Sequence, residues 1–210
     1  MSFVFKFTPE KTHVFIHIPK NGGTALWKIL GDYNPYINTK KRRPDERFVG
    51  HLTYRETKAL FTSNEALSFF CIIRNPWDRI VSNYNYIKQT SPKKHGVRGI
   101  FNRWKKDMPF EEFVEYIVTS GQTKFKPQID YMIDENNALA MDDIIRIDHY
   151  QQDLNSLLLK NGCDVSIEAK KHNASKHAHY TEYYKSEETI RLIEDYESGI
   201  IDLYNYSFGD

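Results

Sequence analysis

Cysteine is scarce in this sequence of 210 residues, and its two copies, Cys71 and Cys163, lie far apart. So few cysteines exclude a disulfide framework, and neither stands at the short spacing of a zinc site. A surplus of charge is also missing, because 29 lysines and arginines face 28 acids and leave a net charge of +1. We therefore expect no nucleic-acid partner and no attraction to an anionic membrane, so any anion site must be local.

Long hydrophobic runs are missing too, since no apolar stretch approaches the roughly 20 residues that span a bilayer. The first residues, MSFVFKFTPEKTH, lack the basic region and long apolar region of a signal peptide. We therefore expect a soluble, cytoplasmic protein. Its length and its 40% hydrophobic content fit one domain, residues 1–210, with a sizeable core.

Three apolar runs rich in β-branched and aromatic residues predict buried strands, at 13–18, 67–74 and 142–148. Helical patterns alternate with them, at 24–30, 53–61, 76–88, 109–120, 150–162 and 186–208. The last begins with a capping box at Ser186, and RFVGH (47–51) is read as a further short strand. Strands that alternate with helices predict an α/β fold with a mostly parallel central sheet flanked by helices.

The first segment that indicates chemistry is PKNGGTA, residues 19–25, between the first strand and its helix. Gly22 and Gly23 permit close approach to the backbone, Thr24 supplies a hydroxyl, and the helix start supplies N–H groups and a positive dipole end. Lys20 adds a charge beside the bound anion. In a Walker loop the lysine follows the glycines, whereas here it precedes them. The alternative is a tight turn with a surface lysine.

The second segment is CIIRNPWDRIVSNY, residues 71–84, where Arg74 follows the second strand. Ser82 lies eight residues on, about two turns along the next helix. Both side chains could reach one phosphate, and ligands of open α/β sheets bind beyond the carboxyl ends of strands. The alternative is that Arg74 pairs with Asp78 and Ser82 faces water. Together the two segments predict a ligand with two separated anionic groups.

At this point the sequence resembles the sulfotransferases that use 3′-phosphoadenosine-5′-phosphosulfate (PAPS). HIPKNGGTA resembles their 5′-phosphosulfate loop, usually close to PKTGGTS, and RNPWDRIVSNY resembles their 3′-phosphate segment. Weaker similarity in VGHLTY, KPQIDYM, IIRIDHYQQDL and the C-terminal segment extends over most of the chain. The carbohydrate branch, with the heparan 2-O- and chondroitin sulfotransferases, is the most similar. The resemblance implies a P-loop-like core and no metal.

The resemblance also implies roles for individual residues. Lys20 would contact the oxygen that bridges phosphate and sulfate, and would stabilise the charge that develops there. The 5′-phosphate would bind to Gly22, Gly23 and Thr24, and the 3′-phosphate to Arg74 and Ser82. Asn21 stands where the family usually has Thr, and Ala25 where it usually has Ser. The loss of a hydroxyl at Ala25 removes one donor and predicts a lower affinity for the cofactor.

Sulfuryl transfer to an alcohol needs a base for the proton of the acceptor hydroxyl. His51 is our candidate, because histidine can be neutral near pH 7 and the segment around it resembles that of the 2-O-sulfotransferases. The alternative is a structural histidine, one of eight in the chain. Rival bases are His17, Glu56 and His149.

Other segments have two readings each. The basic runs 40–43 and 91–106 could bind an acidic acceptor or be solvated loops, and HNASKHAH (172–179) could cover the nucleotide through Asn173 and Ser175. Gln128 and Tyr131 could line the acceptor pocket or pack in the core. Trp77 could meet the adenine or pack against the sheet.

The sequence therefore predicts an enzyme that moves the sulfuryl group from PAPS to a hydroxyl, on a carbohydrate, and leaves 3′,5′-adenosine bisphosphate. Two alternatives remain. A nucleotide-dependent kinase or NTPase would need magnesium ligands, and a lysine after the glycines is usual there. A non-catalytic nucleotide-binding module would keep the loop without the transfer. The sequence does not indicate an oligomeric state.

Overall fold

The structure is a computed structural model, and it describes residues 3–7, 10–30, 51–61, 66–89, 108–121, 126–163, 167 and 178–210. The chain divides into two compact units. The sheet unit comprises Met1–Arg74 and Gln128–Asn173, and the helical unit comprises Asn75–Pro127 and Ala174–Asp210. The single domain expected for residues 1–210 stays a prediction.

The sheet unit is built on four described strands, β1 (Phe3–Phe5), β2 (Thr12–Ile16), β3 (Leu67–Ile73) and β4 (Asp143–Arg146), in the order β1-β2-β3-β4. Strand β1 runs antiparallel to β2, whereas β2, β3 and β4 are parallel to one another. The mostly parallel α/β fold is therefore confirmed. The short β1 was not predicted, because three residues are too few to show a periodic pattern. The carboxyl ends of the three parallel strands lie at one edge of the sheet.

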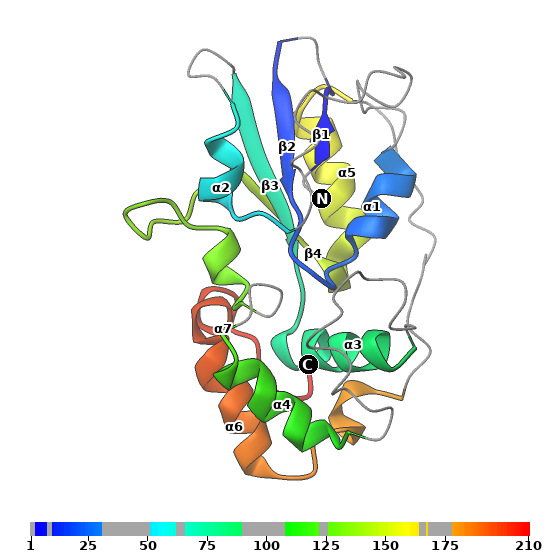
Figure 1. Ribbon diagram of the computed structural model, residues 1–210. Helices are drawn as coiled ribbons and strands as arrows, with labels where there is room; N and C mark the ends of the chain where they lie inside the picture. The colour runs from blue at the N-terminus through cyan, green and yellow to red at the C-terminus, as the bar shows by residue number, and fades with distance from the viewer. Residues whose placement is uncertain are drawn as a thin grey trace. The chain divides into compact units, whose positions relative to one another are not determined.

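Helices cover the sheet on its two faces (Figure 1). Helices α1 (Gly23–Leu30) and α5 (Tyr150–Lys160) pack on one face, over a core that includes Phe15, Leu26, Phe70, Ile72, Ile145 and Leu154. The short helix α2 (Tyr54–Lys58) lies on the other, where the Tyr54 ring meets the Phe69 ring edge-on at 4.7 Å. Because neighbouring residues of a strand face opposite ways, Phe69 and Phe70 serve different faces.

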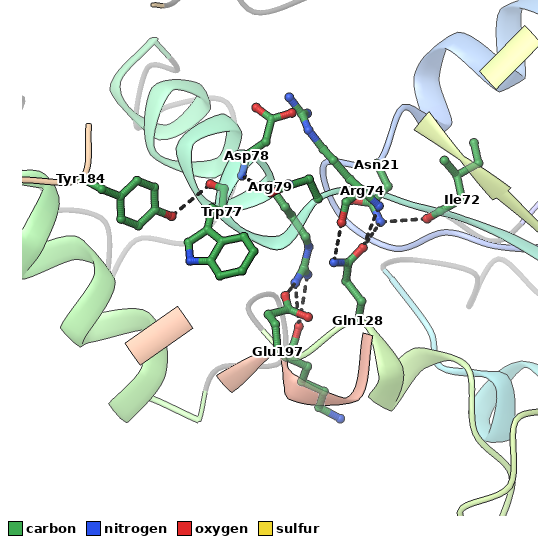
Figure 2. A network of polar contacts seen from close by, with 11 residues as sticks. Asn21, Ile72, Arg74, Trp77, Asp78, Arg79, Gln128, Tyr184 and Glu197 are labelled. Atoms are coloured by element: carbon green, nitrogen blue, oxygen red, sulfur yellow. Dashed lines mark hydrogen bonds and ion pairs between the residues drawn. The ribbon is translucent and has the colours of Figure 1, made fainter. Parts of the chain in front are cut away.

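The helical unit contains α3 (Pro76–Gln89), α4 (Phe110–Thr119), α6 (Glu187–Tyr196) and α7 (Ser198–Tyr204), with the 3₁₀ turn η7 (Tyr180–Glu182). Its core is rich in aromatic side chains. Inside it, Arg79 of α3 and Glu197 form an ion pair whose side chains are both fully buried, and Arg79 also donates to the carbonyl of Lys126 at 3.1 Å (Figure 2). A charge that is removed from water in this way needs such a partner.

The C-terminal helix predicted over 186–208 is two helices. Ser186 is confirmed as its N-cap, because its hydroxyl accepts the N–H of Thr189 at 3.2 Å. The break comes at Glu197, whose backbone has φ −107° and ψ 15° and whose carboxylate turns inward to Arg79. Ser198 and Gly199 follow, and both weaken a helix. Helix α2 is likewise shorter than the predicted 53–61, since it ends at Lys58.

Candidate active site in the sheet unit

The loop between β2 and α1 has the backbone of an anion cradle. Lys20 and Gly22 both take the left-handed conformation, with φ of 70° and 80°. The carbonyl of Gly22 accepts the N–H of Ala25 at 2.9 Å, which closes the first turn of α1. The N–H groups that precede this turn have no partner within the helix and carry its positive dipole end. Thr24, in the same turn, is exposed. The P-loop-like arrangement of strand, glycine loop and helix is therefore present.

The two glycines of this loop are restricted for different reasons, Gly22 by its backbone conformation and Gly23 by its close neighbour. A Cβ atom on Gly22 would lie 3.4 Å from Cδ1 of Ile147, and the positive φ would strain it further. A Cβ atom on Gly23 would lie only 2.3 Å from Nε2 of His17. Gly23 is thus needed for the packing of His17 against the start of α1, a requirement that the sequence does not reveal.

Lys20 and Arg74 lie together at the carboxyl edge of the sheet. Nη1 of Arg74 donates to the carbonyl oxygen of Lys20 at 3.1 Å. Burial, and secondarily the charge of Arg74, lower the pKa of Lys20 from 10.5 to about 8. Two cations held so close repel each other, and an anion between them would relieve the repulsion. Strands β2 and β3 are parallel neighbours, so the loops that follow them lie at the same edge of the sheet.

A buried pair of amides links this loop to the end of β3. Asn21 and Gln128 are both fully buried. Nδ2 of Asn21 donates to the carbonyl of Ile72 at 2.8 Å and to Oε1 of Gln128 at 2.7 Å (Figure 2). The structure therefore places Gln128 in the interior and not on the wall of an open pocket. Tyr131 is fully buried as well. The sequence left two roles open for Gln128, in the acceptor pocket or in the core. It could not decide between them, because the partners of Gln128 lie far away along the chain.

His51 stands beside the same loop. Its Nδ1 lies 2.9 Å from the carbonyl oxygen of His17, and the two imidazole rings are 4.5 Å apart between centroids. A carbonyl oxygen only accepts, so Nδ1 of His51 carries the hydrogen and, in the neutral ring, Nε2 is the basic nitrogen. This tautomer is the one that a base at Nε2 requires.

The rival bases are placed differently. Glu56 accepts the backbone N–H of Thr53 at 2.7 Å and its hydroxyl at 2.9 Å, which completes a capping box at the start of α2. His149 is exposed, and its Nε2 lies 3.6 Å from Oδ2 of Asp148. His17 packs against Phe15, with 5.6 Å between ring centroids. Of the four, His51 combines proximity to the loop with a defined tautomer.

The second predicted segment continues into the helical unit. Oδ1 of Asn75 accepts the N–H of Asp78 at 3.3 Å, and Pro76 begins α3, as predicted. Ser82 is 3% exposed, and its contact with a 3′-phosphate stays a prediction. Trp77 is a core residue, 2% exposed, whose Nε1 donates to the carbonyl of Ile190 at 3.0 Å. Trp77 therefore packs in the core of the helical unit, whereas the sequence suggested contact with adenine or packing against the sheet.

Several predicted segments lie outside the described residues: 40–43, 47–50, 91–106 and 172–177, the last with Asn173 and Ser175. Within the part of the chain that the structure describes, no cluster of three or more His, Cys, Asp or Glu side chains could hold a metal ion. Among those same residues, no helix combines the length and the apolar character needed to cross a bilayer.

The fold and the site define the chain as an α/β protein with a P-loop-like anion cradle. A family model described as "Sulfotransferase family" matches residues 4–207, nearly the whole chain. The chain therefore belongs to the sulfotransferase family, whose members transfer a sulfuryl group to a hydroxyl-bearing acceptor. A search of curated proteins found no match.

Proposed function

We propose that this enzyme takes the sulfuryl group from PAPS and transfers it to a carbohydrate hydroxyl by in-line displacement. The observation that carries the proposal is the convergence of Lys20 and Arg74 on the glycine loop, with Nη1 of Arg74 on the carbonyl of Lys20 at 3.1 Å. A nucleotide with a phosphate at each end of its ribose offers anionic groups to both cations. The carbohydrate acceptor rests on the resemblance to the carbohydrate branch.

The residues of the loop fit the 5′-phosphosulfate end of this donor. Gly22 permits the left-handed turn of the loop, and the N–H groups at the start of α1, with the hydroxyl of Thr24, are suited to phosphate oxygens. Asn21 contributes its backbone, because its side-chain amide is bound to Ile72 and Gln128. The backbone N–H of Ala25 donates to the carbonyl of Gly22, so Ala25 supports the turn that presents the preceding N–H groups. Arg74 and Ser82 are the proposed 3′-phosphate ligands.

The chemistry assigned to the chain is positioning, charge stabilisation and one proton transfer. PAPS supplies an activated sulfuryl group. Nε2 of His51 accepts the proton of the acceptor hydroxyl as its oxygen forms the new bond to sulfur. Lys20 stabilises the negative charge that remains on the phosphate oxygen when the old sulfur–oxygen bond breaks. The products are a sulfate ester, 3′,5′-adenosine bisphosphate and a proton held on His51.

The donor is tested by calorimetric titration with 3′,5′-adenosine bisphosphate, PAPS and ATP, each with and without magnesium. We expect the bisphosphate to bind without magnesium, because two phosphates meet two cations and the helix start. Binding of ATP alone, and only with magnesium, would replace this proposal by a kinase or NTPase function. Binding of the bisphosphate without transfer to any acceptor would favour a non-catalytic module.

The acceptor is tested by transfer of radiolabelled sulfate from PAPS to a panel of desulfated glycosaminoglycans, neutral oligosaccharides, small alcohols and phenols. We expect label in the glycans and, at equal hydroxyl concentration, less in the phenols. Transfer to phenols alone would overturn the carbohydrate acceptor and leave the donor assignment intact.

A further inference from the structure

Among the described residues, the side chain of Gln128 makes hydrogen bonds to Asn21 and to both backbone groups of Arg74, at the point where the two predicted anion-binding segments meet. It belongs to the residue that precedes the 3₁₀ turn η5 (Ile129–Tyr131), and it is fully buried. Oε1 accepts the backbone N–H of Arg74 at 3.0 Å and Nδ2 of Asn21 at 2.7 Å, while Nε2 donates to the carbonyl of Arg74 at 2.9 Å. One amide thus connects the loop after β2 with the residue after β3 (Figure 2).

The two bonds to Arg74 imitate the pairing of a neighbouring strand. The ladder between β3 and β4 ends at Ile73, which pairs with Arg146. One residue further on, the amide of Gln128 takes the place of a strand and binds both backbone groups of Arg74. Both backbone groups of Arg74 are therefore hydrogen-bonded, as they would be in a strand, although the residue lies beyond the end of β3.

Asn21 carries this restraint to the glycine loop. Its Nδ2 is shared between Oε1 of Gln128 and the carbonyl of Ile72, two residues before Arg74. Nη1 of Arg74 then returns to the carbonyl of Lys20. These contacts form a closed circuit from the loop, through Gln128, to Arg74 and back to the loop. Bonds in such a circuit restrict one another, so its members have little freedom to separate.

We propose that Gln128 is a positioning residue that holds the guanidinium of Arg74 and the Lys20 loop at the separation one bisphosphate needs. The inference deepens the proposed function and rests on it. An arginine side chain loses rotamer entropy when it is ordered. Contacts made before the ligand arrives reduce this loss at the moment of binding. The amide suits the task because it supplies donor and acceptor without adding charge beside the two cations.

The test is a double-mutant cycle on bisphosphate affinity, measured by calorimetry without magnesium. Gln128→Met keeps the volume of the side chain and removes its hydrogen bonds to Asn21 and Arg74. We expect it to weaken binding at least tenfold in the wild-type background and less than twofold when Arg74 is already alanine. Equal losses in both backgrounds would overturn the inference, because a general effect on folding does not depend on Arg74.

Two further variants separate positioning from stability. Gln128→Asn keeps the amide but shortens its reach, so we expect the same weakening, and this variant replaces Gln128→Met if the latter does not fold. Asn161→Leu is the matched control, because it removes the bond of Asn161 to Nε2 of His13, 2.8 Å long, near the other end of β2. We expect it to lower stability and leave bisphosphate affinity within twofold.

A measurement without ligand distinguishes failure of this inference from failure of the proposed function. The order parameter of the Arg74 Nε–H, measured by NMR on the ligand-free protein, should fall in Gln128→Met and remain unchanged in Asn161→Leu. An unchanged order parameter in Gln128→Met overturns the positioning role. If the order parameter falls in Gln128→Met but the wild-type protein binds no bisphosphate, the proposed donor is overturned and the restraint of Arg74 by Gln128 is retained.

Discussion

Nη1 of Arg74 donates a hydrogen bond to the carbonyl oxygen of Lys20 across 3.1 Å, although 54 residues separate the two in sequence. The contact joins the ends of two neighbouring parallel strands and places two cations at one edge of the sheet. The proposed chemistry depends on this contact, because neither cation alone would select a nucleotide with two separated phosphates.

The first prediction concerns Lys20 in turnover. Lys20→Ala should lower kcat more than tenfold, about 1.4 kcal/mol of transition-state stabilisation, because it removes the charge next to the breaking bond. Steady-state assays with PAPS measure the effect, and circular dichroism confirms the fold. Lys28→Ala, which removes an exposed lysine on α1, the helix that follows the loop, is the control and should retain full activity. Unchanged kcat in Lys20→Ala would remove Lys20 from the mechanism.

The second prediction concerns pH. Lys20 binds an anion when it is protonated, and its pKa in the folded protein is about 8. Phosphate monoesters complete their ionisation near pH 6, so above pH 7 the ligand does not change its charge. The affinity for 3′,5′-adenosine bisphosphate should therefore fall as pH rises through 8. Arginine stays charged in this range. Lys20→Arg should flatten the profile, and an equally steep profile in that variant would assign the titration to another group.

The third prediction separates proton transfer from binding. His51→Ala should lower kcat at least tenfold and change the bisphosphate dissociation constant less than threefold, because Nε2 of His51 is proposed to act on the acceptor. His149→Ala removes an exposed histidine and should leave both quantities unchanged. A large loss of bisphosphate affinity in His51→Ala would move His51 into the nucleotide site.

The fourth prediction uses the close packing at Gly23. In Gly23→Ala the new Cβ atom would lie 2.3 Å from Nε2 of His17, so the imidazole ring must move. We expect the free energy of unfolding to fall by about 1–3 kcal/mol, the range for overpacked sites. Adding His17→Ala removes the clash. In urea denaturation, the double variant should therefore lose less free energy of unfolding than the two single variants lose in sum. Simple additivity would mean that the ring does not limit position 23.

The fifth prediction tests the buried ion pair of the helical unit. Glu197→Ala leaves the fully buried guanidinium of Arg79 without its carboxylate and should cost about 3–5 kcal/mol in urea denaturation. Replacing both residues, by Arg79→Met and Glu197→Leu, should cost less than the single change. The exposed pair of Glu187 and Arg191 offers a control, because Glu187→Ala should cost under about 1 kcal/mol. If Glu197→Ala and Glu187→Ala lowered the free energy of unfolding by similar amounts, burial would not explain the strength of the Arg79–Glu197 pair.

Much of the fold was predictable because its signals are local. The runs HVFIHI and LSFFCIIR predicted strands that the structure shows as β2 and β3, since a buried parallel strand needs continuous apolar residues. Asn75 and Pro76 predicted the start of α3, because capping depends on neighbours along the chain. The break at Glu197 escaped prediction because its cause, Arg79, lies 118 residues away.

The candidate site also has local features that the sequence predicts and long-range contacts that it does not. Residue types and spacing alone determined that PKNGGTA is a glycine loop between a strand and a helix and that Arg74 follows a strand. The tertiary structure decided that Arg74 contacts Lys20, that Gln128 binds both segments, and that His17 supplies the carbonyl for His51. The physical reason is the range of the interactions. Helix starts and buried strands are encoded by adjacent residues, whereas side-chain hydrogen bonds across a sheet exist only once the strands have paired.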